Sequence, residues 1–310
     1  MSISSSAWSS VDLQTQLSGR NQRRLRPTHD EPFSLEELNA ERIDRCAEEL
    51  FVSQQRAAVA DLLRDVPTDP DAFVSWFERL RERGPGQQDP LFPWLAQEAT
   101  LAQLRWFLGQ EVAGEAGFED LLALTQLKMP ALVKLEMARN FWDEMGRGHA
   151  SGMHGPLLDR LASALSVAAA VADIVPASLS LSNLMVALAW NRRYAFQSLG
   201  ALGAIELTAP GRAAQVNAGL RRLGVAPEVR KYFALHATLD VQHAAAWNRE
   251  VLRPLVAADP RCAQPLAEGA LMRLHAGARC FDAYRAHLWR EGSSAARDLR
   301  EEDQRSPRAA

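Results

Sequence analysis

The segment Leu235-His-Ala-Thr-Leu-Asp-Val-Gln-His-Ala244 carries two histidines and an aspartate at helical spacing. Successive residues of an α-helix rotate by about 100°, so His236, Asp240 and His243 lie within roughly 60° of one another. Two imidazoles and a carboxylate on one stripe make half of a first-row metal site on a rigid helix. Each residue alone fits a capped or solvated polar position, but the three together predict metal ligation.

The composition is that of an ordinary globular protein. The chain has 310 residues, and 47% of them are hydrophobic, so it can bury a sizeable core. The formal net charge of -3 argues against a broad electrostatic attraction to nucleic acid or to an anionic membrane. We therefore expect neither as a partner.

The sequence predicts no targeting or membrane-spanning segment. The most apolar region, residues 157–190, is interrupted by charged residues and a proline, which favours buried core helices. The chain start lacks the charged region and apolar run of a secretory signal. Cys46, Cys262 and Cys280 lie far apart without a Cys-x-x-Cys pair, which indicates neither a disulfide framework nor a thiolate zinc site. We expect a reducing, cytoplasmic location.

Working outward from the opening segment, the whole apolar pattern is helical. Apolar residues recur at helical intervals, and no period-two alternation, Asn-Gly or Asp-Gly hairpin signal or internal repeat is found. The fold class is therefore predicted as all-α, with one bundle-like domain over residues 35–291. Residues 1–34 are expected to be a poorly ordered extension, and 292–310 a disordered charged tail. The predicted helices cover about 34–64, 72–82, 91–127, 130–144, 156–173, 177–206, 211–223, 226–256 and 260–289.

A second pair of candidate ligands is Glu144 and His154. On one straight helix they would lie about 15 Å apart along the axis, too far to meet at one cluster. The glycines between them, Gly146, Gly148 and Gly152, predict a break just after Glu144 that returns His154 toward the same point. The alternative is that Glu144 pairs on the surface and His154 merely starts the next helix.

Glu206 follows the small residues Gly200, Gly203 and Ala204, which would let a neighbouring helix approach closely. A carboxylate inside an apolar run is costly unless it is protonated, hydrogen-bonded or bound to a cation. Glu111 is a further candidate, with an exposed helical glutamate as the alternative.

These residues add up to a mixed carboxylate and imidazole site without a thiolate. Such sites suit iron or manganese, and two ions need bridging carboxylates to offset their charge. The number of ligands therefore points to a dinuclear centre. A ferritin-like bundle would supply two Glu-x-x-His pairs, whereas this chain has none and offers only Asp240-Val-Gln-His243.

The order of these residues resembles that of the heme-oxygenase-like diiron oxidases and oxygenases. Glutamate is followed ten residues later by histidine, and a second glutamate stands 30 residues before His-x-x-x-Asp-x-x-His; Asn140 and the Gly-x-Gly after Glu144 also match. The resemblance covers roughly residues 90–250. By resemblance, Glu111 matches an additional carboxylate of some members, and the six ligands are Glu144, His154, Glu206, His236, Asp240 and His243.

The resemblance implies a single heme-oxygenase-like bundle of about seven core helices that binds two iron ions and no heme. Members activate dioxygen, and the implied hypothesis is a peroxo-diiron intermediate that oxidises a small substrate with electrons from an external donor. The reaction expected is N-oxygenation or oxidative carbon-carbon cleavage of an amino acid or amine. The alternatives are a fatty-acid oxidative decarboxylase and a non-catalytic metal- or partner-binding bundle. The oligomeric state stays open, a homodimer included.

Arg193 is the candidate for binding substrate, because it precedes Glu206 on the same predicted helix. An arginine can anchor a carboxylate through two parallel hydrogen bonds. The alternative is a surface salt bridge.

Overall fold

A computed structural model describes residues 11–27, 29, 34–167 and 173–305, with backbone only over 291–305. All regular structure in these ranges is helical apart from one isolated bridge between Met145 and Met153. The all-α prediction is confirmed. None of the described helices is both long enough and apolar enough to cross a membrane.

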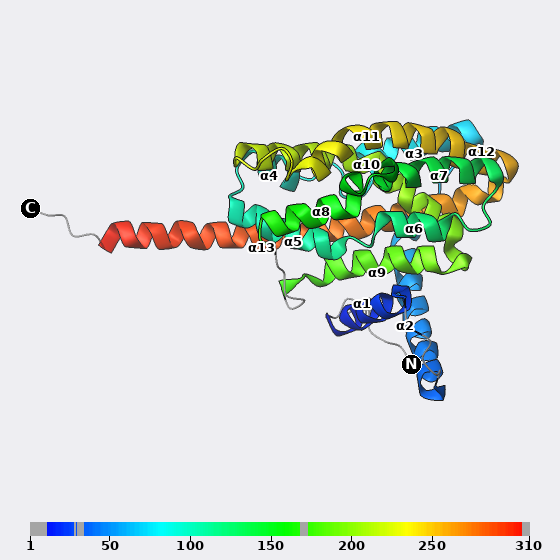
Figure 1. Ribbon diagram of the computed structural model, residues 1–310, viewed down its shortest axis with the longest axis horizontal. Coiled ribbons are helices and arrows are strands. Elements are labelled where there is room, and N and C mark those ends of the chain that lie inside the picture. Colours follow the sequence, from blue (N-terminus) through cyan, green and yellow to red (C-terminus); the bar gives the residue numbers. More distant parts are fainter. Residues whose placement is uncertain (1–10, 28, 30–33, 168–172, 306–310) are drawn as a thin grey trace, which may run out of the picture.

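The helices pack side by side into an elongated bundle (Figure 1). The α-helices are α1 (Val11–Leu25), α2 (Leu35–Val59), α3 (Pro70–Arg83), α4 (Leu91–Gln97), α5 (Leu101–Gly114), α6 (Phe118–Thr125), α7 (Ala131–Glu144), α8 (His154–Ala164), α9 (Pro176–Trp190), α10 (Ala195–Arg222), α11 (Lys231–Trp247), α12 (Arg253–Ala258) and α13 (Ala263–Arg305). Short 3-10 turns at η1 (Ala60–Leu63), η2 (Gly146–Gly148), η3 (Ala150–Gly152), η5 (Arg192–Tyr194) and η7 (Pro260–Cys262) join some of them, and η6 (Asn248–Leu252) is a π-helical turn.

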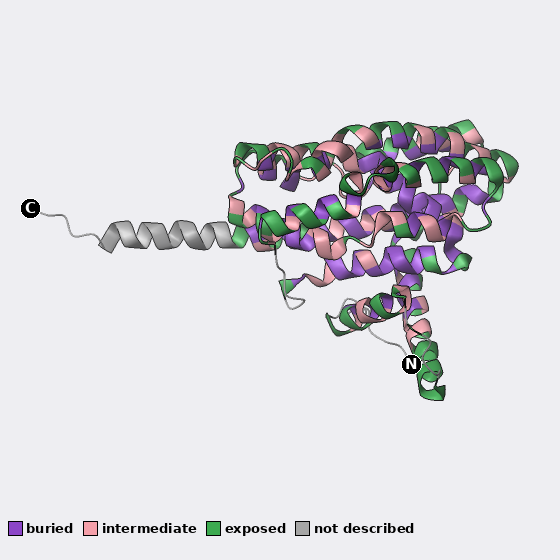
Figure 2. Cartoon of the chain, viewed as in Figure 1, coloured by how far each residue is buried: buried purple, intermediate pink, exposed green. Residues whose placement is uncertain are grey.

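Helix α10 lies at the centre of the bundle, between α13 and α11 (Figures 1 and 2). Glycines permit this close approach: a Cβ added to Gly200 would lie 1.8 Å from the carbonyl oxygen of Leu266 on α13. One turn further along the same face, a Cβ on Gly203 would lie 2.7 Å from the indole ring of Trp247 on α11. The predicted small-residue face is confirmed, and it fixes Glu206, which lies further along α10, in the core.

The chain breaks before α10 at a position that the sequence did not predict. The predicted helix 177–206 is two helices, α9 and α10, separated at Asn191, whose side chain accepts a hydrogen bond from the backbone N–H of Arg193. The predicted break near residue 210 is absent, because α10 continues through Pro210. Proline lacks the N–H that would bond to the carbonyl of Glu206, yet the packing on both sides keeps the helix continuous.

Helix α1 is a second difference, because residues 11–25 fall in the predicted poorly ordered extension. The helix packs on α9, and Leu17 is buried. Three side-chain amides contribute to the contact: Asn183 donates to Oε1 of Gln14 and accepts from Asn21, each at 2.9 Å. Leu13 and Leu25 also pack against the core, but among the polar residues of this segment the apolar pattern was too short to predict a helix. The predicted extension also includes residues that lie outside the described part of the chain, namely 1–10, 28 and 30–33.

The C-terminal part also departs from the prediction. Helix α13 continues to Arg305, past the predicted end of the domain at 291, while 306–310 lie outside the described residues. The predicted helix 226–256 is divided into α11, the π-helical turn η6 and α12. The three candidate ligands of the opening segment all lie on α11, before this turn.

Replacing Gly200 by alanine should reduce the free energy of unfolding by about 1–3 kcal/mol or more, because α10 and α13 must move apart to admit the methyl group. Urea unfolding measures the change. Gly211→Ala is the matched control on the same helix, since nothing lies within 4 Å of its added Cβ. Equal stability of the two variants would contradict the close packing described here.

Candidate metal centre

Five of the six predicted ligands come together in two overlapping groups. Glu144, His154 and His236 form one, and Glu144, Glu206 and His243 form the other. In each group the candidate ligand atoms lie within 4.8 Å of one another. Glu144 belongs to both groups. The side chains come from α7, α8, α10 and α11, so the centre forms where four helices meet.

Glu144 and His154 meet because the chain reverses between them, as predicted. Gly146 and Gly148 have φ angles of +61° and +84°, a backbone conformation that residues other than glycine rarely adopt. A Cβ on Gly146 would also lie 2.5 Å from the carbonyl carbon of Gly152, so the backbone at Gly152 passes very close to Gly146. His154 then opens α8 with its Nδ1 atom 2.6 Å from Oε2 of Glu144.

Helix α11 supplies the other side of the centre. The ring of His236 lies 4.6 Å from that of His154, measured between centroids. Asp240 is outside both groups, yet it is buried and lines the same cavity as Glu144 and Glu206. Burial, and then the charges of Glu206 and Glu144, raise the pKa of Asp240.

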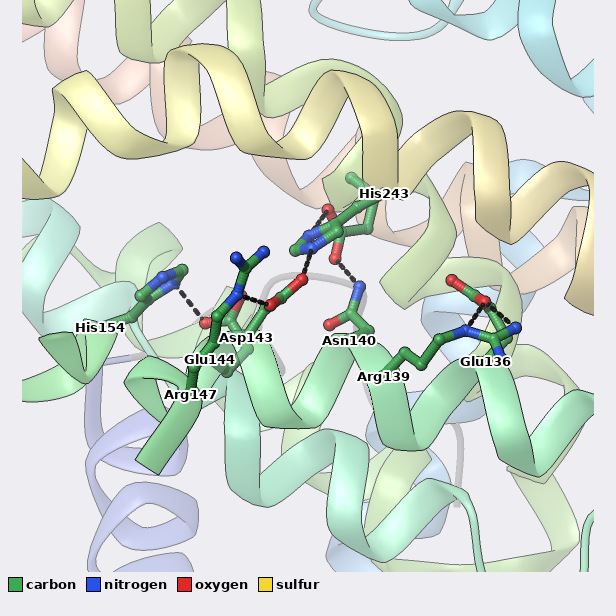
Figure 3. A network of polar contacts seen from close by, with 9 residues as sticks. Glu136, Arg139, Asn140, Asp143, Glu144, Arg147, His154 and His243 are labelled. Atoms are coloured by element: carbon green, nitrogen blue, oxygen red, sulfur yellow. Dashed lines mark hydrogen bonds and ion pairs between the residues drawn. The ribbon is translucent and has the colours of Figure 1, made fainter. Parts of the chain in front are cut away.

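Neighbouring groups orient the candidate ligands. Asn140 donates a hydrogen bond of 2.6 Å to Oε1 of Glu206 (Figure 3). His236 Nδ1 lies 2.8 Å from the backbone carbonyl oxygen of Tyr232, so in the tautomer that donates this bond Nε2 is the free nitrogen. Metal-binding histidines commonly have one ring nitrogen held in this way.

Asp143 is a member of the site that the sequence analysis missed. Its Oδ2 atom lies 3.0 Å from Nε2 of His243, and its Oδ1 accepts a 2.6 Å bond from Arg147 (Figure 3). His243 Nδ1 then faces Oε2 of Glu206 at 3.4 Å. Asp143 directly precedes a candidate ligand, but only the position of His243 across the bundle reveals its role.

Buried charge shapes the protonation of the metal-free site. Burial, followed by the charge of Glu206, raises the pKa of Glu144 well above its ordinary value. Burial lowers the pKa of both His154 and His236 to about 4. Burial also lowers that of His243, but hydrogen bonds and charges from Glu206 and Asp143 outweigh it and raise the pKa to about 9. The carboxylates therefore repel one another unless protons or cations lie between them.

Two buried atoms of the site, Nε2 of His154 and Oδ1 of Asp240, have no polar partner among the described residues, and their chemistry fits a cation. The Nδ1 atoms of His154 and His243 face carboxylate oxygens of Glu144 and Glu206. Two ligands about 2.1 Å from one metal ion lie at most about 4.2 Å apart, so groups of atoms within 4.8 Å need only small movements to bind one. Nitrogen and carboxylate donors without thiolate suit iron or manganese.

A cavity of about 130 Å³ adjoins the centre and reaches between α5, α10, α11 and α13. Glu111 lines it but does not join either group of candidate ligands. Arg212 and Arg273, which the sequence analysis did not single out, also line it. The sequence could not single them out, because the pattern of α10 and α13 does not show which face of each helix meets the cavity.

Arg193 lies elsewhere. Its side chain is 71% exposed and stands 3.5 Å from Glu49, and it does not line the cavity. The surface salt bridge is therefore what the structure shows, because Arg193 lies in the turn before α10 rather than on the helix with Glu206. Arg193 is therefore not placed to bind a substrate in this cavity.

Replacing Asp143 by asparagine should weaken iron binding by about 10- to 100-fold, because the carboxylate that orients His243 and strengthens it as a ligand is lost. Competition with a chelating dye measures the affinity. Arg147→Gln is the control, since it removes the exposed partner of Asp143 and leaves the contact with His243 in place. Unchanged affinity in Asp143→Asn would exclude this orienting role.

The metal-free protein should lose stability as the pH rises, and Asp240 should contribute to the loss. Burial, then the charges of Glu206 and Glu144, raise the pKa of Asp240 from 3.8 to about 10. Between these values the folded protein keeps a proton that the unfolded chain has released, so the free energy of unfolding falls with rising pH. In Asp240→Asn the melting temperature should fall less between about pH 5 and about pH 9. Parallel melting curves for the wild type and the variant would rule out this contribution.

Comparison with known proteins agrees with this geometry. A family model described as iron-containing redox enzyme matches residues 105–278, a range that includes all six predicted ligands. A search of curated proteins finds no match. The matched range covers more than half of the chain. The helical bundle, the grouped carboxylates and imidazoles and the family match lead to one conclusion: the chain belongs to the iron-containing redox enzyme family.

Proposed function

We propose that this protein is an O2-dependent, non-heme diiron oxidase or oxygenase that oxidises a small organic substrate. Membership of the family makes it an iron-dependent oxidoreductase. The number of ions, the use of dioxygen and the absence of heme are the parts of the proposal that go further.

One observation carries the proposal: the two groups of candidate ligands share Glu144. A carboxylate has two oxygens, so Glu144 would be able to help hold an ion in each group. His154 and His236 would complete one position, and Glu206 and His243 the other. Asp240, buried beside both glutamates, offers a further oxygen. Three carboxylates offset most of the charge of two divalent ions, as a buried site requires.

When bound, a pair of ferrous ions would supply electrons for the reduction of dioxygen. The chain's own groups hold the geometry for this chemistry. Asn140 keeps one oxygen of Glu206 occupied, and Asp143 holds the ring of His243. The surrounding helices exclude bulk water, since Glu144, Glu206 and Asp240 are all buried. Turnover would also need electrons from an external donor.

The cavity beside the candidate ligands is the reason for proposing a small organic substrate, because a molecule in it would lie next to the metal centre. Glu144, Glu206 and Asp240 form part of its wall, and apolar side chains make up about half of it, among them Phe92, Phe118, Leu158, Ile205, Val216 and Phe233. This lining suits N-oxygenation or oxidative cleavage of an amino acid or amine. It suits oxidative decarboxylation of a fatty acid as well, which is the second candidate because an apolar chain could lie against these side chains.

The anaerobic wild-type protein should bind about two ferrous ions per chain. Asp240→Ala should bind at least one ion fewer while its circular dichroism stays helical, because one buried ligand is lost. Val241→Ala is the control on the same helix, with a side chain that is 52% exposed. Titration of Fe(II) under argon measures the stoichiometry.

Rapid mixing of the iron-loaded protein with oxygen completes the test. We expect oxygen uptake in the presence of a substrate, tried first among amino acids, amines and fatty acids. A stoichiometry near one ion contradicts the dinuclear centre. Two ions without oxygen uptake under any of these conditions would instead favour a non-catalytic metal-binding bundle.

A further inference from the structure

Four charged side chains face the cavity without touching one another. Arg212 on α10 and Arg273 on α13 line it together with Glu111 and Glu115 on or next to α5. Neither arginine makes a hydrogen bond or an ion pair with any described residue, and each senses these charges only at a distance. The accessible surface of Glu115 faces this cavity and a neighbouring one between α1 and α9.

Arg24, another partly buried arginine, has an ion-pair partner, since it lies 2.7 Å from Glu48. Arg212 and Arg273 have no such partner among the described residues, and the Nε atom of Arg273 is buried without a hydrogen bond. A partly buried guanidinium without a counter-ion is costly, so two of them at one cavity indicate that a partner from outside the chain belongs there.

The two arginines are held apart from the glutamates that share the cavity. The guanidinium of Arg212 lies over the rings of Phe92 and Phe281, 5.9 and 5.6 Å from their centroids, so its edges stay available for hydrogen bonds. Burial raises the pKa of Glu111 and of Glu115 toward the neutral form. Burial lowers the pKa of Arg212 to about 10, which leaves it charged at neutral pH. Arg212 is therefore a cation at this end of the cavity, without a carboxylate in ion-pair contact.

The distance between the arginines and the metal centre fits a molecule with an anionic group at one end and an oxidisable group at the other. Arg212 follows Glu206 by six residues on α10, a rise of about 9 Å along the helix axis. Apolar side chains, among them Phe118 and Phe233, line the cavity along with these charged groups. An anionic group at the arginines would leave the apolar body of the same molecule facing the metal centre.

We propose that Arg212 and Arg273 bind the carboxylate of the substrate, so that the enzyme acts on a small organic acid and not on a simple amine. The inference rests on the proposed function. Guanidinium groups recognise carboxylates and phosphates through paired, charge-assisted hydrogen bonds, and carboxylate is the anion that the acid substrates considered under the proposed function carry. A fatty acid and an amino acid share this group, and the experiment separates them.

Calorimetry with four probes tests the proposal: octanoate, L-phenylalanine and the primary amide of each. The full chain is used in two forms, loaded with Fe(II) under argon and metal-free. At least one acid should bind both forms about tenfold more tightly than its amide. Tighter binding of octanoate identifies a fatty acid, and tighter binding of L-phenylalanine an amino acid. The proposal is overturned if neither acid binds, if the amides bind equally well, or if the acids bind only to the iron-loaded form.

Arg212→Gln and Arg273→Gln should each weaken acid binding by roughly 10- to 100-fold. Arg212→Lys keeps the charge but loses the paired donors, so an intermediate loss is expected, and this variant serves if the glutamine variant does not fold. Arg221→Gln is the control, because Arg221 is an exposed arginine on the same helix that does not line the cavity. Wild-type affinity in both cavity variants would also overturn the proposal.

Iron stoichiometry separates this inference from the proposed function. The arginine variants should still bind as many ferrous ions as the wild type, since neither arginine belongs to the candidate ligand groups. Acid binding that depends on both arginines in a protein that takes up no oxygen leaves the anion site standing and removes the oxidase. Oxygen uptake that is driven by simple amines and is unchanged in the arginine variants would support the oxidase and remove the anion site.

Discussion

The burial of three carboxylates in one place is the constraint on which this structure depends. Glu144, Glu206 and Asp240 are each almost fully shielded from water, and their charges act on one another. A helical core tolerates such a group of acids only when protons, hydrogen bonds or cations compensate it. The imidazoles of the site add donors without adding negative charge, so the whole arrangement is explained by cations at its centre.

The scaffold meets this constraint through close backbone contacts far more than through flexible side chains. Gly200 and Gly203 let α10 fit tightly between its neighbours, which leaves Glu206 little freedom. The reversal at Gly146 and Gly152 does the same for the ends of α7 and α8. Ligand positions that are set by backbone packing are more exact than positions set by loops, and a site that changes its charge during a reaction needs such support.

Much of this could be predicted from the sequence, because it depends on spacing along one segment. The stripe on α11, the break after Glu144 and the small-residue face of α10 each follow from local pattern. Features that depend on partners across the bundle could not be predicted. The role of Asp143 needs the position of His243. The amides that join helix α1 to α9 need the position of Asn183, and Arg212 shows its importance only once the cavity is known.

The placement of three site residues on one helix also restricts how this chain can change. His236, Asp240 and His243 share a stripe only because three and two residues separate them. One residue inserted between the first two would turn His236 by about 100° relative to the others and carry it out of the centre. The outward side chains of α11, such as Val241, are free to vary. The number of residues between His236 and His243 cannot vary, so insertions and deletions are confined to the segments on either side of this stretch.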